Sequence, residues 1–390
     1  MATISAQAQR HYIMVSGTRQ ITDDAQTRNV AFRMTDNASL SPSTPVWHRL
    51  DSESGRRSWA SEGAMVPGRM EWSKQYRDVA DDSNLALFGV FAASGETAGG
   101  VARIGVTSVY IQDVMGPASG ASTTSNIKAF TLEDVGLPGI QDDAYNRLVY
   151  NVFPESVTVS GRAGGFVNIS AQLRGGGKDT AIGGAATTPV YFRNRVFRFS
   201  DMALLSNLTC GMSAINVTGF TSAPSSAQFL SDTQLTVAGA VDLTSICKSF
   251  TMTINNTVNV DDSYQPGYVD ANGFAVVPAL GWVRTGHSVR IEAKFLLGDT
   301  NSKLLRAESR AGTQRGIELW LKHPMAVETG AYVGNRISFG YADLVAYSET
   351  PDGLGPKYIN CTWEAVDSGT EGTKAWRYIA ANTYTTAITA

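Results

Sequence analysis

Few side chains in this sequence have types and spacing that could do chemistry. Its four histidines are scattered and form neither an H-E-x-x-H motif nor any other metal-ligand pair: His11, His48, His287 and His323. The chain has no G-x-S-x-G nucleophile motif, and no G-x-G-x-x-G motif between a strand and a helix. The sequence therefore gives no catalytic, cofactor-binding or metal-binding residue, and we expect no cofactor and no enzymatic activity.

The cysteines Cys210, Cys247 and Cys361 are odd in number and far apart. This argues against a disulfide framework and against a zinc site. We expect them to be small buried apolar residues.

Two further patterns are weaker. The glycine-rich loop GGGKDT fails the P-loop pattern, because Gln172 and Asp179 occupy positions that require Gly and Ser or Thr around Lys178. The carboxylate pairs Asp81-Asp82 and Asp261-Asp262 lie at a predicted helix cap and a predicted turn, where structural roles suffice. Folding could still assemble a site from distant residues.

The composition is typical of a β-rich structural protein. The 390 residues are 43% hydrophobic but only 17% charged, which suits a surface partly covered by copies of itself, and the net charge of -3 gives no overall bias towards nucleic acid or membranes. No apolar run approaches the length of a membrane span, so no membrane partner is expected. The start, MATISAQAQRHYIM, lacks the pattern of a secretion signal, so we expect folding in a cytoplasm.

Residues 248–262, KSFTMTINNTVNVDD, predict a strand around which the other elements are arranged. Phe250, Met252 and Ile254 alternate with small polar residues, which predicts that these three side chains face the core. We expect Thr251 and Thr253 on the opposite face, and a break at Asn255-Asn256.

Other elements follow from local patterns. Residues 81–94 predict a helix, and residues 300–311 predict a second one capped by Thr300 or Asn301. Residues 102–113 and 288–297 predict strands.

Residues 190–200, VYFRNRVFRFS, place arginines beside aromatic residues. Binders of single-stranded nucleic acid use this combination. The alternation is also that of an ordinary strand, which we favour.

The order of elements in the second half resembles that of the tail tube (major tail) proteins of long-tailed bacteriophages. It runs from the strand KSFTMTINNTV through a long polar loop, the strand SVRIEAKFLL, the helix SKLLRAES and the strands GIELWLKH and NRISFGYADL to the turn ETPDG and the strand YINCTWEAVDSG. In the first half, GRMEWSKQY, DDSNLALFGVFAAS, SNIKAFTLED, YNRLVYNVFPESVTVS and FVNISAQLRGGG resemble the same family.

This resemblance divides the chain into four parts. Residues 1–28 are an N-terminal arm, residues 29–188 and 244–390 are the two halves of a tail-tube module, and residues 189–243 are an insertion expected on the outer surface. The fold expected is mainly β: an antiparallel, barrel-forming β-sandwich with one or two flanking short α-helices and an inserted β segment.

The resemblance also implies a function. Tail tube subunits assemble into stacked rings, commonly of six copies, in which neighbouring sheets join into a closed inner barrel that conducts the genome. Partners would be other copies, terminator, tape measure and distal tail proteins, and double-stranded DNA in non-specific passage. The alternatives are another virion β protein, such as a baseplate hub or capsid decoration protein, or a carbohydrate-binding adhesive module.

The contact between copies is expected in residues 261–281. Tyr264, Tyr268, Phe274 and Trp282 lie in or beside this polar loop. Exposed aromatic side chains are frequent anchors at protein interfaces. We therefore expect the loop to become ordered against a neighbouring subunit.

Overall fold

The structure is a computed structural model of the chain. It describes residues 12–16, 30–33, 39–40, 43–50, 59–75, 96–97, 102–104, 109–115, 130–135, 147–177, 179–181, 196–207, 210–211, 218–233, 235, 240–270, 272–278, 281–327, 329–350, 355–366 and 376–382. The predicted helix over residues 81–94 lies outside these ranges.

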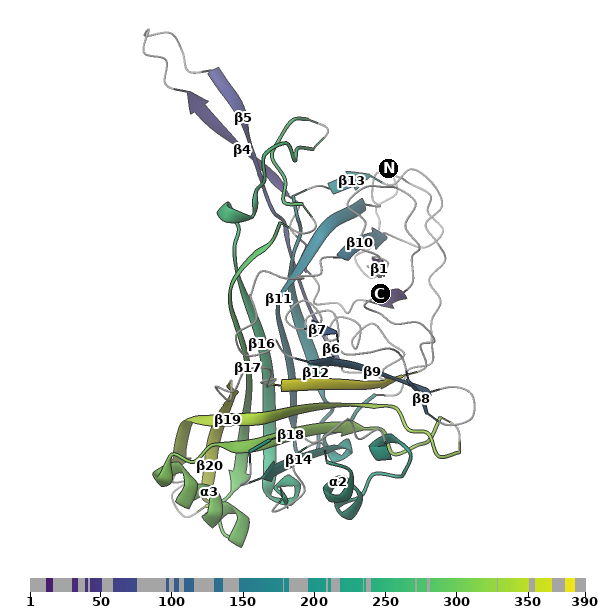
Figure 1. The fold of residues 1–390 in the computed structure, drawn as a ribbon, viewed down its shortest axis with the longest axis vertical. Coiled ribbons are helices and arrows are strands. Elements are labelled where there is room, and N and C mark those ends of the chain that lie inside the picture. Colours follow the sequence, from purple (N-terminus) through teal and green to yellow (C-terminus); the bar gives the residue numbers. More distant parts are fainter. Residues whose placement is uncertain are drawn as a thin grey trace.

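The described part of the chain is mainly β and every named pair of strands is antiparallel, which confirms the predicted fold class. Its two α-helices are short: α2 (Ser226–Asp232) and α3 (Thr300–Ala311). Both lie at one end of the molecule (Figure 1).

Eight of the described strands form a main sheet. Its order is β3 (Ser39–Leu40), β6 (Arg69–Gln75), β12 (Asn168–Arg174), β11 (Arg147–Arg162), β16 (Cys247–Asn259), β17 (Val283–Leu296), β20 (Tyr358–Ala365) and the second half of β19 (Gly334–Thr350). The long strands in its middle, such as β11, β16 and β17, run along the molecule (Figure 1).

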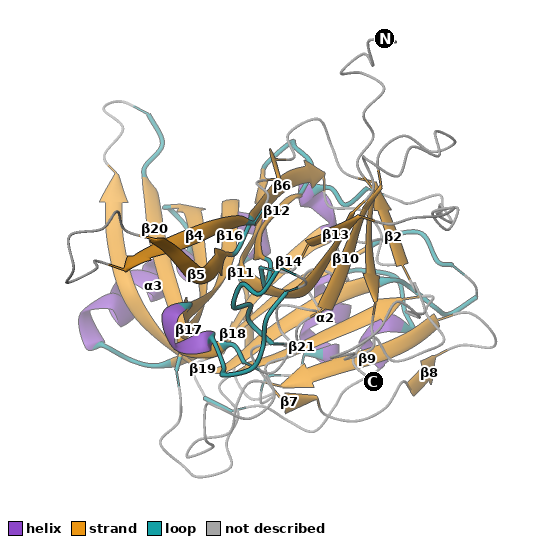
Figure 2. Ribbon diagram, turned by 90° about the horizontal axis from the view of Figure 1, so that it is seen from above, coloured by secondary structure: helices purple, strands orange, loops and turns teal. Residues whose placement is uncertain are grey.

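A second sheet, the cross sheet, lies across one end of the main sheet (Figures 1 and 2). Its order is β15 (Ala240–Asp242), β14 (Met202–Asn207), β18 (Arg315–Lys322), the first half of β19, β21 (Trp376–Asn382) and β9 (Val109–Met115), which also pairs with β7 (Glu96–Thr97) and β8 (Ala102–Ile104). Strand β19 belongs to both sheets, so it forms a corner of a sandwich.

The core lies between these two sheets. Phe250, Met252 and Ile254 are at most 2% exposed and belong to one large cluster with residues of β14, β18 and β19. Their predicted orientation is therefore confirmed.

The predicted break at Asn255-Asn256 is wrong, because β16 continues to Asn259. The side chain of Asn256 is buried, and its amide donates to the carbonyl of Pro154 at 3.2 Å. A partner within the sheet thus removes the cost of burying a polar amide in the strand.

Strand β11 bends where it leaves a small sheet and enters the main one. Its first half pairs with β10 (Phe130–Val135) and β13 (Asp179–Ala181), and β10 in turn pairs with β1 (Tyr12–Ser16), next to β2 (Val30–Arg33). Asn151 stands at the bend with a φ of 55°, a left-handed conformation that asparagine tolerates better than most residues.

Several predicted elements differ from the structure. The predicted strand over residues 102–113 is two strands, β8 and β9, and β21 was not predicted at all. The cap of α3 is Asp299, whose carboxylate accepts from the amide of Ser302 at 2.7 Å.

In the described part of the segment 189–243, strands β14 and β15 belong to the cross sheet. Strand β14 pairs with β18 within the cross sheet, and its six residues are all buried. Residues 218–235, here called the cover, lie over the other face of β18, where Phe220 and Phe229 pack on Trp320 with ring centroids 5.4 and 5.3 Å away. The segment is thus part of the core.

Candidate assembly surface

The face of the main sheet that points away from the core is polar. Along β16, Thr251 and Thr253 are half-buried, as the alternation predicts. Much of this face is cross-linked by its own side chains, for example by an ion pair between Arg290 and Glu364 at 2.9 Å and by the hydroxyl of Ser156 on Gln172 at 3.3 Å. The face therefore consists largely of neutral groups and paired charges.

One edge of the main sheet is open. Residues 343–350 of β19 pair with β20 on one side, and no described strand pairs with their other side. Val345 is 51% exposed, and Ala346 and Ser348 are also exposed. An exposed strand edge offers unpaired backbone donors and acceptors to another chain.

The opposite edge is formed by β6. This strand pairs with β12 along its whole length, whereas β3 covers only Met70 and Glu71. Among the described strands, none pairs with the outer side of residues 72–75. Among the strands that the structure describes, both edges of the main sheet are therefore open.

A hairpin of β4 (Thr44–Leu50) and β5 (Trp59–Val66) projects beyond the body of the protein (Figure 1). Its base is joined to the loop 261–281. Met65 donates its amide to the carbonyl of Ala275 at 3.0 Å, and Ala275 donates to the carbonyl of Gly63 at 3.1 Å. Val46 and Val66 are 42% and 44% exposed. We call this hairpin and the joined loop the arm.

The loop 261–281 differs from the prediction of exposed aromatic anchors. Phe274 and Trp282 are buried, and Trp282 packs on Phe153 with ring centroids 5.5 Å apart. The bend residue Asn151 accepts from the indole of Trp282 and donates to the carbonyl of Val277, both at 2.8 Å. The described part of this loop is thus anchored within its own chain.

Two large apolar side chains in the described part of the loop remain exposed. Tyr268 and Val269 are 38% and 55% exposed. Tyr264 is half-buried, and its hydroxyl donates to the carbonyl of Met65 at 2.6 Å, while burial raises the pKa of this phenol. Tyr264 therefore fixes the loop to the hairpin, and Tyr268 and Val269 are available for a contact.

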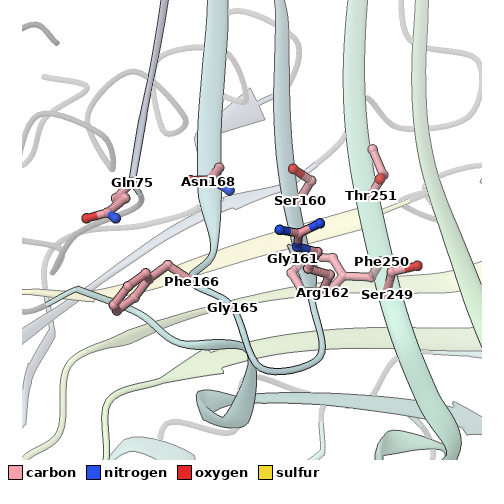
Figure 3. A pocket seen from close by; sticks show the side chains of 10 residues that line it. All are labelled: Gln75, Ser160, Gly161, Arg162, Gly165, Phe166, Asn168, Ser249, Phe250 and Thr251. Atoms are coloured by element: carbon pink, nitrogen blue, oxygen red, sulfur yellow. The ribbon is translucent and has the colours of Figure 1, made fainter. Parts of the chain in front are cut away.

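A hollow of about 520 Å³ lies at the other end of the polar face (Figure 3). It is lined by Gln75, Ser160, Gly161, Arg162, Gly165, Phe166, Asn168, Ser249, Phe250 and Thr251. Asn168 of β12 pairs with Gln75 of β6, whereas Arg174 pairs with Arg69 next to the arm. The hollow and the arm therefore lie at opposite ends of these strands.

Two of the three cysteines lie in the buried environment that the sequence predicts. Cys247 and Cys361 are buried, and burial raises the pKa of each thiol to about 12. Cys210 is partly exposed, and burial also raises its pKa. Such thiols are protonated at neutral pH and are poor nucleophiles.

The histidines in the described part of the chain are not grouped with carboxylates into a metal site. In the described ranges, no group of three or more His, Cys, Asp or Glu side chains could hold a metal ion. The indole of Trp376 donates to Nε2 of His287 at 2.9 Å, and Nδ1 of His287 lies 2.8 Å from Oδ1 of Asn256. His287 thus joins the main sheet to the cross sheet. Asp261 and Asp262 lie exposed in a 3-10 turn.

No helix in the described part of the chain is long and apolar enough to cross a membrane.

Sequence reasoning missed the open edge of β19, because the predicted strand NRISFGYADL ended at Leu344. The alternation of residues 343–350, DLVAYSET, was the available signal. It was weak because a strand that leaves one sheet for another changes which side chains are buried.

No protein-family model matches the chain, and no curated protein matches it. Among solved structures, the chain is similar to one described as "Tail of empty GTA particle computed with helical refinement, C6 symmetry", with 8% identity and a TM-score of 0.23, over 40% of this chain and 96% of the other. A likeness at this level supports no conclusion about function.

Proposed function

We propose that this protein is the structural subunit of a bacteriophage tail tube. Its copies would assemble in the cytoplasm of the host into stacked rings, six to a ring, and the channel would conduct the genome during ejection. The ordered resemblance of the sequence to tail tube proteins motivates this proposal. The open main sheet is the observation in the structure that supports it.

A ring of copies would satisfy both open edges. If residues 343–350 of one copy pair with β6 of the next, the main sheets continue from copy to copy until the ring closes. Closure leaves no free strand edge, which also limits uncontrolled aggregation. The polar face of the main sheet would then line the channel.

The same arrangement would place the insertion outside. The cross sheet and its cover lie on the other side of the core from the polar face. Residues 189–243 would therefore face away from the channel, as predicted from the sequence. The arm, including residues 261–281, would contact a neighbouring copy, and the tube ends would contact terminator, tape measure and distal tail proteins.

Negative-stain microscopy of the purified protein tests this proposal. We expect rings and tubes from the native sequence. The double variant Ala346→Lys/Ser348→Lys should fold but form neither, because charged side chains on the edge oppose strand pairing. Ala227→Lys/Ser231→Lys adds the same charge at exposed positions of α2 and should assemble normally.

Two results would contradict the proposal. The native protein could remain in isolated compact particles at every concentration and salt tested, or the edge variant could form tubes as readily as the α2 variant. Circular dichroism and thermal unfolding of each variant would show whether a loss of assembly reflects a loss of folding.

A further inference from the structure

Three cationic residues gather at the hollow end of the polar face. Arg162 ends β11 and is exposed. Arg198 is also exposed, and it forms an antiparallel bridge with Phe166, so its side chain and the Phe166 ring emerge on the same side. The backbone of Lys248 lies beside that of Ala163, because its carbonyl accepts from the amide of Ala163 at 2.8 Å. We call this group the cationic corner.

The cations of this corner lack the carboxylate partners that several arginines elsewhere on the protein have. Arg290, Arg306 and Arg174 each contact a carboxylate. In contrast, no described carboxylate lies within ion-pair distance of the three cations of the corner. Asp201 is near, but it is only 8% exposed, and its carboxylate accepts from the backbone amide of Arg198 at 2.8 Å.

The lining of the hollow adds neutral hydrogen-bonding groups. Ser160, Asn168, Ser249 and Thr251 present hydroxyls and an amide, and their side chains make no hydrogen bond with another described residue. Figure 3 shows these groups and Arg162 around the hollow, with the ring of Phe166 at its side. Phe166 is 45% exposed, so its ring is accessible from solvent.

We propose that the cationic corner and the hollow bind the phosphodiester backbone of DNA. Arginine, lysine, hydroxyl and amide donors are the groups that proteins direct at phosphate oxygens. The exposed Phe166 ring beside two arginines adds a surface on which an unpaired base can stack. The sequence 190–200, with its arginines and aromatic residues, contributes Arg198 to this site.

This inference rests on the proposed function. It assigns to the DNA in the channel a specific binding site on each subunit. A smooth channel needs no such contact, so the corner would slow the passage of DNA at one level of each ring. Because ring copies repeat the corner around the channel, weak individual contacts would add up. The test is made at protein concentrations below those at which rings form, so it does not depend on tube formation.

Fluorescence anisotropy with a labelled 30-base-pair duplex, and with one of its strands alone, measures the binding. We expect the native protein to bind the duplex with a Kd of roughly 10⁻⁴ to 10⁻⁶ M near physiological salt, and we expect the affinity to fall steeply as salt rises. The double variant Arg162→Gln/Arg198→Gln should weaken binding about tenfold and reduce the slope of log K against log salt by about 2, because two phosphate contacts are lost.

Two further variants separate the contributions. Arg290→Gln removes an exposed arginine from the same face and should leave the affinity within about twofold, because that arginine is already paired. Phe166→Ala should weaken binding of the single strand more than that of the duplex, because only unpaired bases stack on the ring. Circular dichroism confirms that each variant is folded.

The inference is overturned if the native protein does not bind either DNA at low salt, or if Arg290→Gln weakens binding as much as the double variant does. It is also overturned if heparin binds as tightly as duplex DNA with the same dependence on Arg162 and Arg198, since the corner is then a general anion site. Tubes that form from the native protein without DNA binding would leave the proposed function standing, and DNA binding without tubes would leave this inference standing.

Discussion

The outward faces of both sheets carry polar side chains, but only one of these faces is covered by another described segment of the chain. On the main sheet, Thr251 and Thr253 stay half-buried and no described segment covers them. On the cross sheet, Glu318 and Lys322 are completely buried beneath the cover, residues 218–235. One face is closed within the chain, and the other is left open.

Covering this face of the cross sheet buries charged side chains, which therefore need partners. Lys322 donates to the carbonyl of Gly219 in the cover, and Arg336 donates to the carbonyl of Asp232 at 2.9 Å and lies over the ring of Trp320. Such bonds are needed because an unpaired buried charge is very costly. This face of the cross sheet is therefore covered within the chain, whereas no described segment covers the polar face of the main sheet.

The largest effect is expected from placing a charged side chain on the buried face of β16. Ile254 is completely buried, so Ile254→Asp should cost more than about 4 kcal/mol and prevent folding. Thr253→Asp, one residue away on the polar face, should fold with a loss of about 1 kcal/mol or less. Urea unfolding followed by circular dichroism measures both, and a folded Ile254→Asp protein would contradict the assignment of the faces.

A smaller loss is expected from opening the cover. Phe229 packs on Trp320, and Phe229→Ala should cost about 3 kcal/mol through the cavity it leaves. Ser231→Ala, on the exposed side of the same helix, should change the free energy of unfolding by about 0.5 kcal/mol or less. Equal losses from both variants would show that the cover does not stabilise the cross sheet.

The sequence predicted those elements whose side chains alternate or repeat along a local stretch of chain. The faces of β16, helix α3 and the strands β17, β18 and β20 could be found because their side chains alternate or repeat at a regular spacing. The cover could not, because its role depends on contacts between residues about a hundred positions apart, such as Arg336 with Asp232. The cationic corner could not be predicted for the same reason, since Arg162, Arg198 and Lys248 are brought to one end of the sheet only by folding.

The pH dependence of stability tests whether the cover keeps water from the cross sheet. Burial lowers the pKa of Lys322 from 10.5 to about 8. Between these two values the unfolded chain binds more protons than the folded one, so this residue makes stability rise as pH increases from 8 to 10.5. Below pH 8, burying the charged Lys322 lowers the free energy of unfolding by its full amount.

Lys322→Met should therefore stabilise the protein near pH 7, by an amount on the order of 1–3 kcal/mol, and the gain should shrink towards pH 10.5. Comparing the two proteins at each pH cancels the opposing titration of the buried thiols Cys247 and Cys361, whose pKa values are raised to about 12. Thermal or urea unfolding from pH 7 to 10.5 provides the measurement. A constant difference across this range would mean that Lys322 is solvated in the folded protein.

The smallest effect is expected on the open face. Arg290 and Glu364 form an ion pair at 2.9 Å, but their side chains are 47% and 24% exposed. Water and salt screen such a pair, so a double-mutant cycle with Arg290→Gln and Glu364→Gln should give a coupling energy of about 0.2–1 kcal/mol that falls as salt is added. A coupling above about 2 kcal/mol that is insensitive to salt would place the pair in a dry environment, contrary to an open face. The same cycle repeated in assembled tubes would sharpen the comparison, because a water-filled channel should leave the coupling small, whereas a face buried against a neighbour should increase it.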